Sequence, residues 1–269
     1  MYCDFYGLKE VPFNVTADPH YLFFSRKHRE AFSHLVYGVE QKKGIIVLTG
    51  EIGTGKTTLC RAFLNQISKK VKSAFIINPS FSGRELLRAI LEDFGIRSLN
   101  KNKFSLLSNL NKFLLRQKEV DNNAVLIIDE AQNLKTSELE QIRLLSNLET
   151  EKEKLLQIIL VGQPELNRRI QLYNLRQLRQ RIMVNYHILP LDEDEVSKYI
   201  YHRLTIAGSD GRIKFSLSAL KKIYEFSSGI PRLINFICDR ALLLGFIREK
   251  REIDEEILNI CIKDFDQYK

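Results

Sequence analysis

One stretch of eight residues combines glycines with a lysine and a hydroxyl side chain, which suits it to holding phosphate groups. It reads Gly50-Glu51-Ile52-Gly53-Thr54-Gly55-Lys56-Thr57 and matches G-x-x-x-x-G-K-[ST] at every specified position. Glycines let such a loop turn its N–H groups toward phosphate oxygens, and a following helix adds its positive N-terminal end. We therefore predict an ATP-binding P-loop from Gly50 to Thr57, with Lys56 on the β- and γ-phosphates, Thr57 on Mg²⁺ and Thr58 also in the nucleotide site.

Two adjacent acids follow a short apolar run at residues 124–128, where they have little structural reason to stand. Burying carboxylates is costly unless a cation or hydrogen bonds compensate. Asp129 is suited to hold Mg²⁺, often through water, and Glu130 is suited to polarise a water for attack on a γ-phosphate. The alternative is two solvated acids that open a loop. Together with the P-loop, the pair predicts ATP hydrolysis.

Alternating strands and helices must position these residues. Short apolar runs predict strands at 45–48, 74–77, 125–128, 156–161 and 184–189. Helical periodicity predicts helices at 27–41, 56–67, 84–93, 104–118 and 137–148. This alternation is typical of a parallel sheet covered on both faces, so we expect an α/β fold. The glycine-rich stretch then lies between a strand and a helix, which is the context that the motif requires.

From Asp192 onward the pattern is helical only. Helices are expected from 192 to about 206, over 217–226, over 231–246 and from Asp254 onward. We therefore predict two domains: a nucleotide-binding domain over 1–191 and a helical lid over 192–269. Residues 1–26 precede the first helix and are expected to be irregular and rich in aromatic side chains.

With both motifs in place, the chain resembles the AAA+ ATPases. The resemblance implies a three-layer αβα domain with a five-stranded parallel sheet, followed by a small all-α lid. It also nominates Gln163, after the fourth strand, as the sensor-1 residue; many members carry Asn or Thr there, and an ordinary strand-ending glutamine is the alternative. Gly229-Ile230-Pro231-Arg232 resembles the sensor-2 signature, which implies that Arg232 leans over the bound phosphates.

Five arginines fall within fourteen residues that contain no acid: Arg168, Arg169, Arg176, Arg179 and Arg181. The resemblance implies that an arginine just before the fifth strand reaches into the neighbouring subunit's site and stabilises charge on the γ-phosphoryl group. Arg181 matches that position best, and Arg179 is second. A finger that acts in trans requires a homo-oligomer. A basic helix face, which could also contact nucleic acid, is the alternative.

Longer strings resemble the ExeA/GspA-type ATPases of the general secretion pathway. They include Tyr6-Gly7-Leu8-Lys9-Glu10-Val11-Pro12-Phe13, Asp129-Glu130-Ala131-Gln132-Asn133-Leu134, Val161-Gly162-Gln163-Pro164-Glu165-Leu166 and Gly229-Ile230-Pro231-Arg232-Leu233-Ile234-Asn235. They span nearly the whole chain in the family's order. The resemblance implies that residues 1–26 pack near the adenine, with His28 at its rim. Packing of these aromatic side chains in a core is the alternative.

The composition is that of a basic globular protein: 269 residues, a formal net charge of +8 and a pI of about 9.2. A basic balance favours an acidic partner, although a solvated basic surface is equally compatible. Four separated cysteines indicate thiols in a reducing compartment. No apolar run approaches the ~18 residues of a membrane span, so a cytoplasmic location is expected, peripheral at the inner membrane only through a partner. Secretion-pathway members commonly continue into membrane and peptidoglycan-binding regions, so ending at Lys269 suggests a short relative or the cytosolic part of a longer chain.

We therefore predict an oligomeric AAA+ protein that binds and hydrolyses ATP with Mg²⁺ and remodels or positions a secretion or pilus assembly protein. The alternative, motivated by the pI and the arginines, is a DNA-binding accessory protein of a transposition system. A passive nucleotide-binding scaffold is disfavoured, because the acidic pair and both candidate sensor arginines are present.

Overall fold

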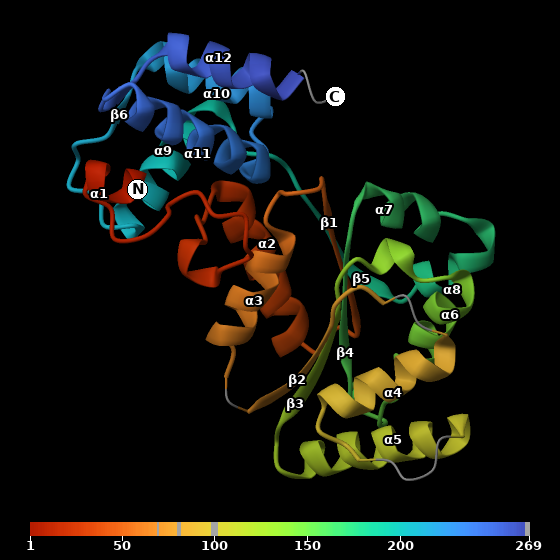
Figure 1. Ribbon diagram of the computed structural model, residues 1–269. Helices are drawn as coiled ribbons and strands as arrows, with labels where there is room; N and C mark the ends of the chain where they lie inside the picture. The colour runs from red at the N-terminus through yellow and green to blue at the C-terminus, as the bar shows by residue number, and fades with distance from the viewer. Residues whose placement is uncertain (69, 80–81, 98–101, 267–269) are drawn as a thin grey trace. The chain divides into compact units, whose positions relative to one another are not determined.

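The computed structural model describes residues 1–68, 70–79, 82–97 and 102–266 (Figure 1). The chain divides into two compact units. The sheet unit comprises residues 29–50 and 59–188, and the helical unit comprises residues 1–28, 51–58 and those from Leu189 onward. Most of the P-loop is therefore grouped with the helical unit. The predicted domain boundary near Leu191 stays a prediction, and its C-terminal end at 267–269 lies outside the described residues.

Five parallel strands form the sheet in the order β2-β3-β4-β1-β5. They are β1 (Ile45–Gly50), β2 (Val71–Ile76), β3 (Asn123–Ile128), β4 (Gln157–Gly162) and β5 (Ile182–Ile188). Every residue of β1 and β4 is buried, as expected where helices cover both faces. The five predicted strands are confirmed, with ends that shift by one to three residues.

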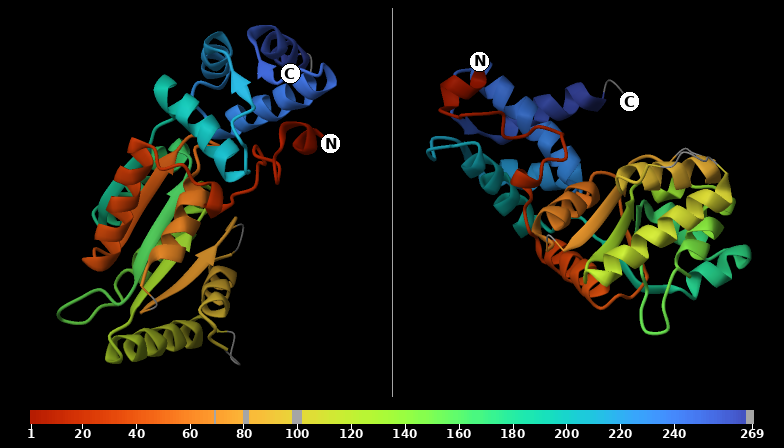
Figure 2. Two further views of the ribbon diagram at one scale, coloured as in Figure 1. Left: turned by 90° about the vertical axis from the view of Figure 1, so that its left-hand side faces the viewer. Right: turned by 90° about the horizontal axis from the view of Figure 1, so that it is seen from below.

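Helices cover the two faces of this sheet (Figure 2). On one side lie α2 (Arg26–Glu40) and α3 (Lys56–Gln66), and on the other lie α4 (Gly83–Asp93), α5 (Lys103–Glu119) and α6 (Thr136–Leu145). Leu87, Leu110 and Ile142 of the second group pack in one core with alternate residues of the central strands. The three-layer αβα architecture is therefore confirmed.

Several short helices follow the strands where the sequence pattern is too brief to predict them. They are η2 (Ala131–Asn133), α7 (Pro164–Ile170), η3 (Tyr173–Leu175) and α8 (Arg176–Arg179). Pro164 stands in the first turn of α7, where its missing N–H costs no hydrogen bond. Helix α7 begins directly after Gln163 and therefore sets the direction in which the chain leaves β4.

The helical unit contains four long helices: α9 (Glu193–Ile206), α10 (Leu217–Ser227), α11 (Pro231–Ile247) and α12 (Glu255–Asp266). Asp192 and Glu195 form a capping box at the start of α9. The predicted helical C-terminal region is confirmed, with one addition: β6 (Lys214–Phe215) and β7 (Glu252–Ile253) pair in parallel. Two-residue strands are too short to produce a periodic signal.

The N-terminal segment is not irregular throughout, since it contains α1 (Tyr2–Tyr6) and the 3₁₀ turn η1 (Pro19–Tyr21). Tyr6 and Phe13 are buried in the core of the helical unit. The Tyr6 hydroxyl donates to the carbonyl of Lys250 at 3.0 Å. This segment therefore packs on the lid helices, and its place beside an adenine stays a prediction. None of the described helices is both long and apolar enough to cross a membrane.

Candidate nucleotide site

The P-loop turns at two glycines with positive φ, Gly53 at 84° and Gly55 at 90°. A Cβ at Gly53 would lie 2.6 Å from the Cβ of Arg232, and one at Gly55 would lie 3.2 Å from Nε2 of His28. Both the backbone conformation and the close neighbours therefore require glycine at these two positions.

The Lys56 side chain is buried and folds back along the loop. Its Nζ donates to the carbonyl of Glu51 at 2.8 Å, and the Thr54 hydroxyl donates to the same carbonyl at 2.8 Å. A phosphate oxygen is a stronger, charged acceptor for an ammonium group than a neutral carbonyl. The Lys56 ammonium thus contacts the backbone of its own loop, where a phosphate would compete for its protons.

The first turn of α11 lies against the P-loop. The backbone N–H of Arg232 donates to the carbonyl of Gly53 at 3.3 Å, and the Ile230 side chain lies 3.2 Å from a Cβ built at Gly53. Pro231 stands in the first turn of the helix. The predicted sensor-2 arginine is therefore next to the P-loop, with its side chain exposed.

His28 lies beneath the same loop. It is only 3% exposed; its Nε2 is 2.9 Å from the carbonyl of Thr54, and its Nδ1 is 2.7 Å from the hydroxyl of Ser25. Burial lowers the pKa of His28, which favours the neutral imidazole. Both ring nitrogens are thus engaged with protein atoms. The predicted adenine contact is untested.

The two acids stand at the carboxyl end of β3 in the sheet unit. Asp129 is 2% exposed, and its carboxylate accepts the backbone N–H of Glu130 at 2.9 Å. Glu130 adopts a left-handed conformation with φ of 53°, which bends the chain sharply after the strand. Because the bend separates the two side chains, each can take a different role.

Two glutamines hold the Glu130 carboxylate. Oε2 accepts from Nε2 of Gln132 at 2.5 Å and from Nε2 of Gln163 at 3.2 Å. The Gln132 side-chain oxygen accepts the backbone N–H of Gln163 at 3.1 Å, and Arg169 donates to the Gln132 carbonyl. The structure therefore brings Glu130 and Gln163 together. Gln132 is not among the predicted site residues, although its position two residues after the candidate base Glu130 could have indicated it.

A further polar group lies at the carboxyl ends of β1 and β5. The buried hydroxyl of Thr49 accepts from Nδ2 of Asn167 at 2.7 Å and lies 3.0 Å from Nδ1 of His187. Thr49 stands one residue before Gly50, where the P-loop begins. No sequence pattern predicts this group, because its members come from three separate elements.

Arg181 is not brought to Glu130 within the chain. Ile182 pairs with Ile45, the first residue of β1, whereas Ile188 pairs with Gly50, the last. Arg181 therefore stands at the amino end of the sheet, and the strand length separates it from the opposite edge by about 20 Å. Arg179 is exposed and donates to the Gln171 side chain at 2.9 Å.

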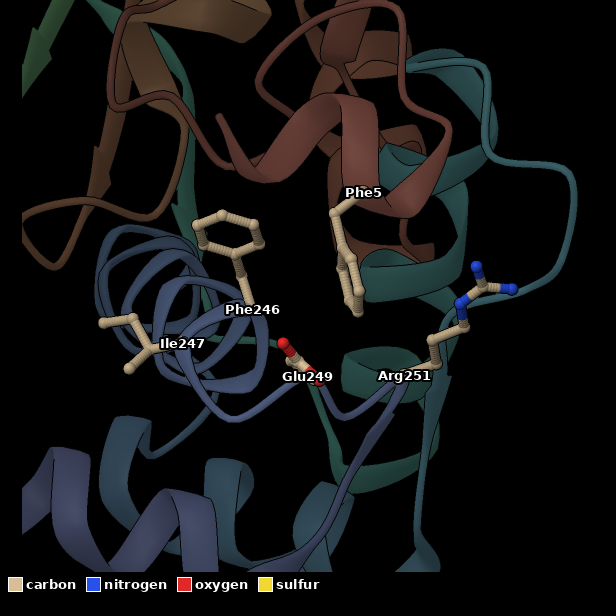
Figure 3. Close-up of a pocket in the computed structure, with 5 residues that line it drawn as sticks. All are labelled: Phe5, Phe246, Ile247, Glu249 and Arg251. Carbon is tan, nitrogen blue, oxygen red and sulfur yellow. The ribbon is translucent and has the colours of Figure 1, made fainter.

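A hollow of about 770 Å³ in the helical unit contains none of the predicted site residues (Figure 3). It is lined by Phe5, Phe246, Ile247, Glu249 and Arg251. Phe5 packs edge-on against Phe246 at 5.6 Å, and the Arg251 guanidinium lies 5.7 Å from the Phe5 ring. Its lining presents neither a nucleophile beside a base nor a set of metal ligands, so it suggests no reaction.

A family model described as "AAA domain" matches residues 39–170 of the chain. The match includes the P-loop, the acidic pair and Gln163. The chain is also 45% identical to general secretion pathway protein A of Aeromonas hydrophila over 254 residues. That alignment covers 94% of this chain and 46% of the relative, so the chain spans about half the length of the relative.

Solved structures share the fold at low sequence identity. The ORC2 protein of Aeropyrum pernix matches with a TM-score of 0.68 and 15% identity, over 95% of this chain and 71% of that one. Cdc6p of Pyrobaculum aerophilum matches with a TM-score of 0.67 and 19% identity, over 88% of this chain and 66% of that one. RuvB of Thermotoga maritima matches with a TM-score of 0.59 and 16% identity, over 89% of this chain and 69% of that one. With its AAA domain, its fold and its 45% identity to general secretion pathway protein A, the chain belongs to the ExeA/GspA-type AAA+ ATPases.

Proposed function

We propose that the chain hydrolyses ATP to ADP and phosphate in the presence of Mg²⁺, as a homo-oligomer that remodels or positions a partner assembly. The observation that carries this proposal is the Glu130 carboxylate, held on one oxygen by Gln132 and Gln163. Oε1 makes no hydrogen bond to the described residues, which leaves it to accept a proton from water. An oriented carboxylate with one oxygen available is what a water-activating base requires.

The P-loop would bind the phosphates through its N–H groups and Lys56. Thr57 stands in the first turn of α3 and Asp129 is buried at a strand end; a hydroxyl and a carboxylate are oxygen ligands that Mg²⁺ accepts alongside water and phosphate oxygens. When bound, Mg²⁺ would neutralise charge on the β- and γ-phosphates.

In this proposal a water forms a bond to the γ-phosphorus as the bond from that phosphorus to the bridging oxygen of ADP breaks. Oε1 of Glu130 takes the proton of the water, and ADP leaves with the electron pair of the broken bond. Gln163 keeps the carboxylate aimed, and Lys56 and Arg232 stabilise the departing charge. Arg181, or Arg179, would come from a neighbouring subunit, since Arg181 stands at the other edge of its own sheet.

Substitution of Glu130 by Gln tests this mechanism, because the amide keeps the shape and removes the basic oxygen. We expect steady-state ATP turnover to fall by about 10²-fold or more, the usual contribution of a general base. Glu165→Gln is the matched control, since Glu165 is an exposed acid nearby on α7 and should leave turnover unchanged. Turnover of Glu130→Gln at the parental rate would refute the assignment of the base.

The partner is proposed from the relative. Because that protein is named for the general secretion pathway, we propose a protein of a secretion or pilus machine as the partner, reached from the cytoplasmic side of the inner membrane. Co-purification of the chain with components of a secretion or pilus machine, stronger with ATP than with ADP, is the expected result. Recovery of a transposase instead would favour the DNA alternative.

A DNA-associated function has one structural observation in its favour. Arg168, Arg176 and Arg179 are exposed around α7 and α8, and Arg176 lies 5.5 Å from the ring of Tyr173, which is itself 82% exposed. Exposed arginines and an aromatic ring suit a nucleic-acid backbone. ATP-dependent binding of duplex DNA with a steep negative salt slope would support it, and no binding at about 100 mM salt would exclude it.

A further inference from the structure

The orientation of one peptide group in the P-loop depends on a residue from far earlier in the chain. In a trans peptide the C=O and the next N–H point in opposite directions. The Thr54 carbonyl faces Nε2 of His28 at 2.9 Å, so the N–H of Gly55 points away from His28. N–H groups at this place in such a loop are the ones that face a bound phosphate.

The hydrogen bonds determine which nitrogen of His28 carries the proton. A carbonyl oxygen can only accept, so Nε2 donates to Thr54, and Nδ1 of the neutral ring then accepts from the Ser25 hydroxyl at 2.7 Å. The Ser25 oxygen in turn accepts the backbone N–H of His28 at 3.2 Å. The ring is therefore held in one tautomer and one orientation, and it is buried.

The same ring also limits where the loop can lie. A Cβ on Gly55 would approach Nε2 to 3.2 Å, so the backbone at Gly55 already rests against the edge of the imidazole. With φ of 90°, Gly55 could otherwise move among several conformations open only to glycine. Hydrogen bond and contact together hold Thr54 and Gly55 in a single arrangement.

We propose that His28 is a positioning residue for phosphate binding, which holds the Thr54–Gly55 peptide so that the Gly55 N–H faces the phosphates of ATP. This inference rests on the proposed binding of ATP by the P-loop. It assigns to His28 an action through the backbone of the loop and no contact with the adenine. Preorganised donors bind more tightly because their ordering is already complete before the ligand arrives.

Three substitutions of His28 separate these roles. Gln carries an amide nitrogen at about the reach of Nε2 and can still donate to Thr54, whereas the shorter Asn cannot, and Ala has no donor. We expect His28→Ala and His28→Asn to weaken ATP binding about tenfold, the equivalent of one lost hydrogen bond and its ordering, and His28→Gln to stay within about threefold of the parent. His34→Gln, on the exposed side of the same helix, is the control.

Amide hydrogen exchange over residues 51–58, measured without nucleotide, is the second readout. It should be faster in His28→Ala and His28→Asn than in the parent and near parental in His28→Gln. If His28 acted only through a contact with the adenine, exchange over these residues would be the same in the parent and in the three variants. That result would overturn the inference. Circular dichroism checks folding; if His28→Ala does not fold, the difference between the Asn and Gln variants still decides.

The two proposals fail in different ways. A parent chain that does not bind ATP at all would refute the proposed function. A parent chain that binds ATP, with His28→Ala and His28→Asn binding equally well, would refute the role of His28 alone. Equal weakening by Gln and Ala would also refute it, because the donor would then not be the property that matters.

Discussion

The sheet unit and the helical unit hold their functional residues by different physical means. In the sheet unit, Glu130 and Gln163 stand directly after buried parallel strands, whose register fixes where each strand ends. In the helical unit, the P-loop is held by a buried histidine, by the backbone of α11 and by glycines with positive φ. One set of groups depends on apolar packing, and the other depends on particular polar contacts.

This difference has a consequence for substitutions. Apolar packing tolerates small volume changes, since neighbouring side chains shift to accommodate them. A loop held by single hydrogen bonds and by glycine conformations tolerates almost none at those positions. We therefore expect ATP binding to be the more easily lost property, whereas changes in the sheet unit should lower turnover at saturating ATP only where they alter Glu130 or the groups that hold it.

The largest expected effect is the loss of stability in Gly229→Ala. This substitution tests the backbone turn that leads into α11. Gly229 has φ of 75°, and an added Cβ would lie 1.9 Å from the carbonyl oxygen of Leu191. Because backbone must move, we expect a loss of more than about 3 kcal/mol in the free energy of unfolding. Denaturant unfolding measures it.

The control for Gly229→Ala comes from the sheet unit. A Cβ at Gly38 would meet side chains and no backbone, with Ile46 Cδ1 at 2.4 Å and Ile46 Cγ1 at 2.8 Å, so Gly38→Ala should cost less than Gly229→Ala. Equal costs for the two would contradict the contrast between the units.

The second effect concerns Arg203, which ties the N-terminal segment to α9. It is buried, donates to the carbonyls of Pro12 at 2.5 Å and Asn14 at 3.1 Å, and lies 4.4 Å from the Tyr21 ring. Met at this position would fill the space and leave the Pro12 carbonyl without its partner, whereas the Asn14 carbonyl keeps a donor in Asn235. Unfolding stability should fall by about 2 kcal/mol. An unfolding midpoint of Arg203→Met equal to that of the parent would show that water replaces the guanidinium as the hydrogen-bond donor.

The third effect concerns the hydrogen bonds that hold the Glu130 carboxylate at the carboxyl end of the sheet. Gln163→Ala removes one of the two donors to Glu130 and leaves the P-loop unaltered. Turnover should fall by about tenfold with little change in ATP affinity, the loss that corresponds to one charge-assisted hydrogen bond in the transition state. Equilibrium titration and steady-state kinetics on one preparation distinguish the two. A weakened affinity with unchanged turnover would place Gln163 outside the catalytic group.

The smallest effect is a pH dependence that should arise in the helical unit. Burial lowers the pKa of His28 and of His202. A lowered folded-state pKa means stability that is present above the unfolded pKa of about 6.5 and is lost as the pH falls toward the folded value. Between pH 7 and 5.5 the loss should be at most about 1 kcal/mol per histidine. His28→Gln should flatten part of it; an unchanged slope would assign the dependence elsewhere.

Much of the sheet unit could be predicted from sequence, because buried parallel strands produce continuous apolar runs. The P-loop could be predicted as well, because its motif has a strict spacing. The acidic pair could be predicted because carboxylates directly after an apolar run are costly without a function. The group around Thr49 could not, since its members come from distant elements.

The helical unit was harder to predict in detail. His28 and Arg203 look like ordinary surface residues in the sequence, and only the return of residues 1–28 onto α9 and the P-loop buries them. The strands β6 and β7 are two residues each and leave no pattern. The features that were not predicted therefore depend on long-range contacts between short segments.

The central claim is that Glu130 acts in ATP turnover but not in ATP binding, whereas Lys56 is needed for binding; one paired measurement tests it most directly. ATP affinity and ATP turnover are determined on the same preparations of the parent chain, Lys56→Ala and Glu130→Gln. Lys56→Ala should weaken binding by about tenfold or more, the loss of a charge-assisted contact, and Glu130→Gln should bind normally with turnover reduced about 10²-fold or more. Parental turnover in Glu130→Gln, or parental affinity in Lys56→Ala, would contradict the account.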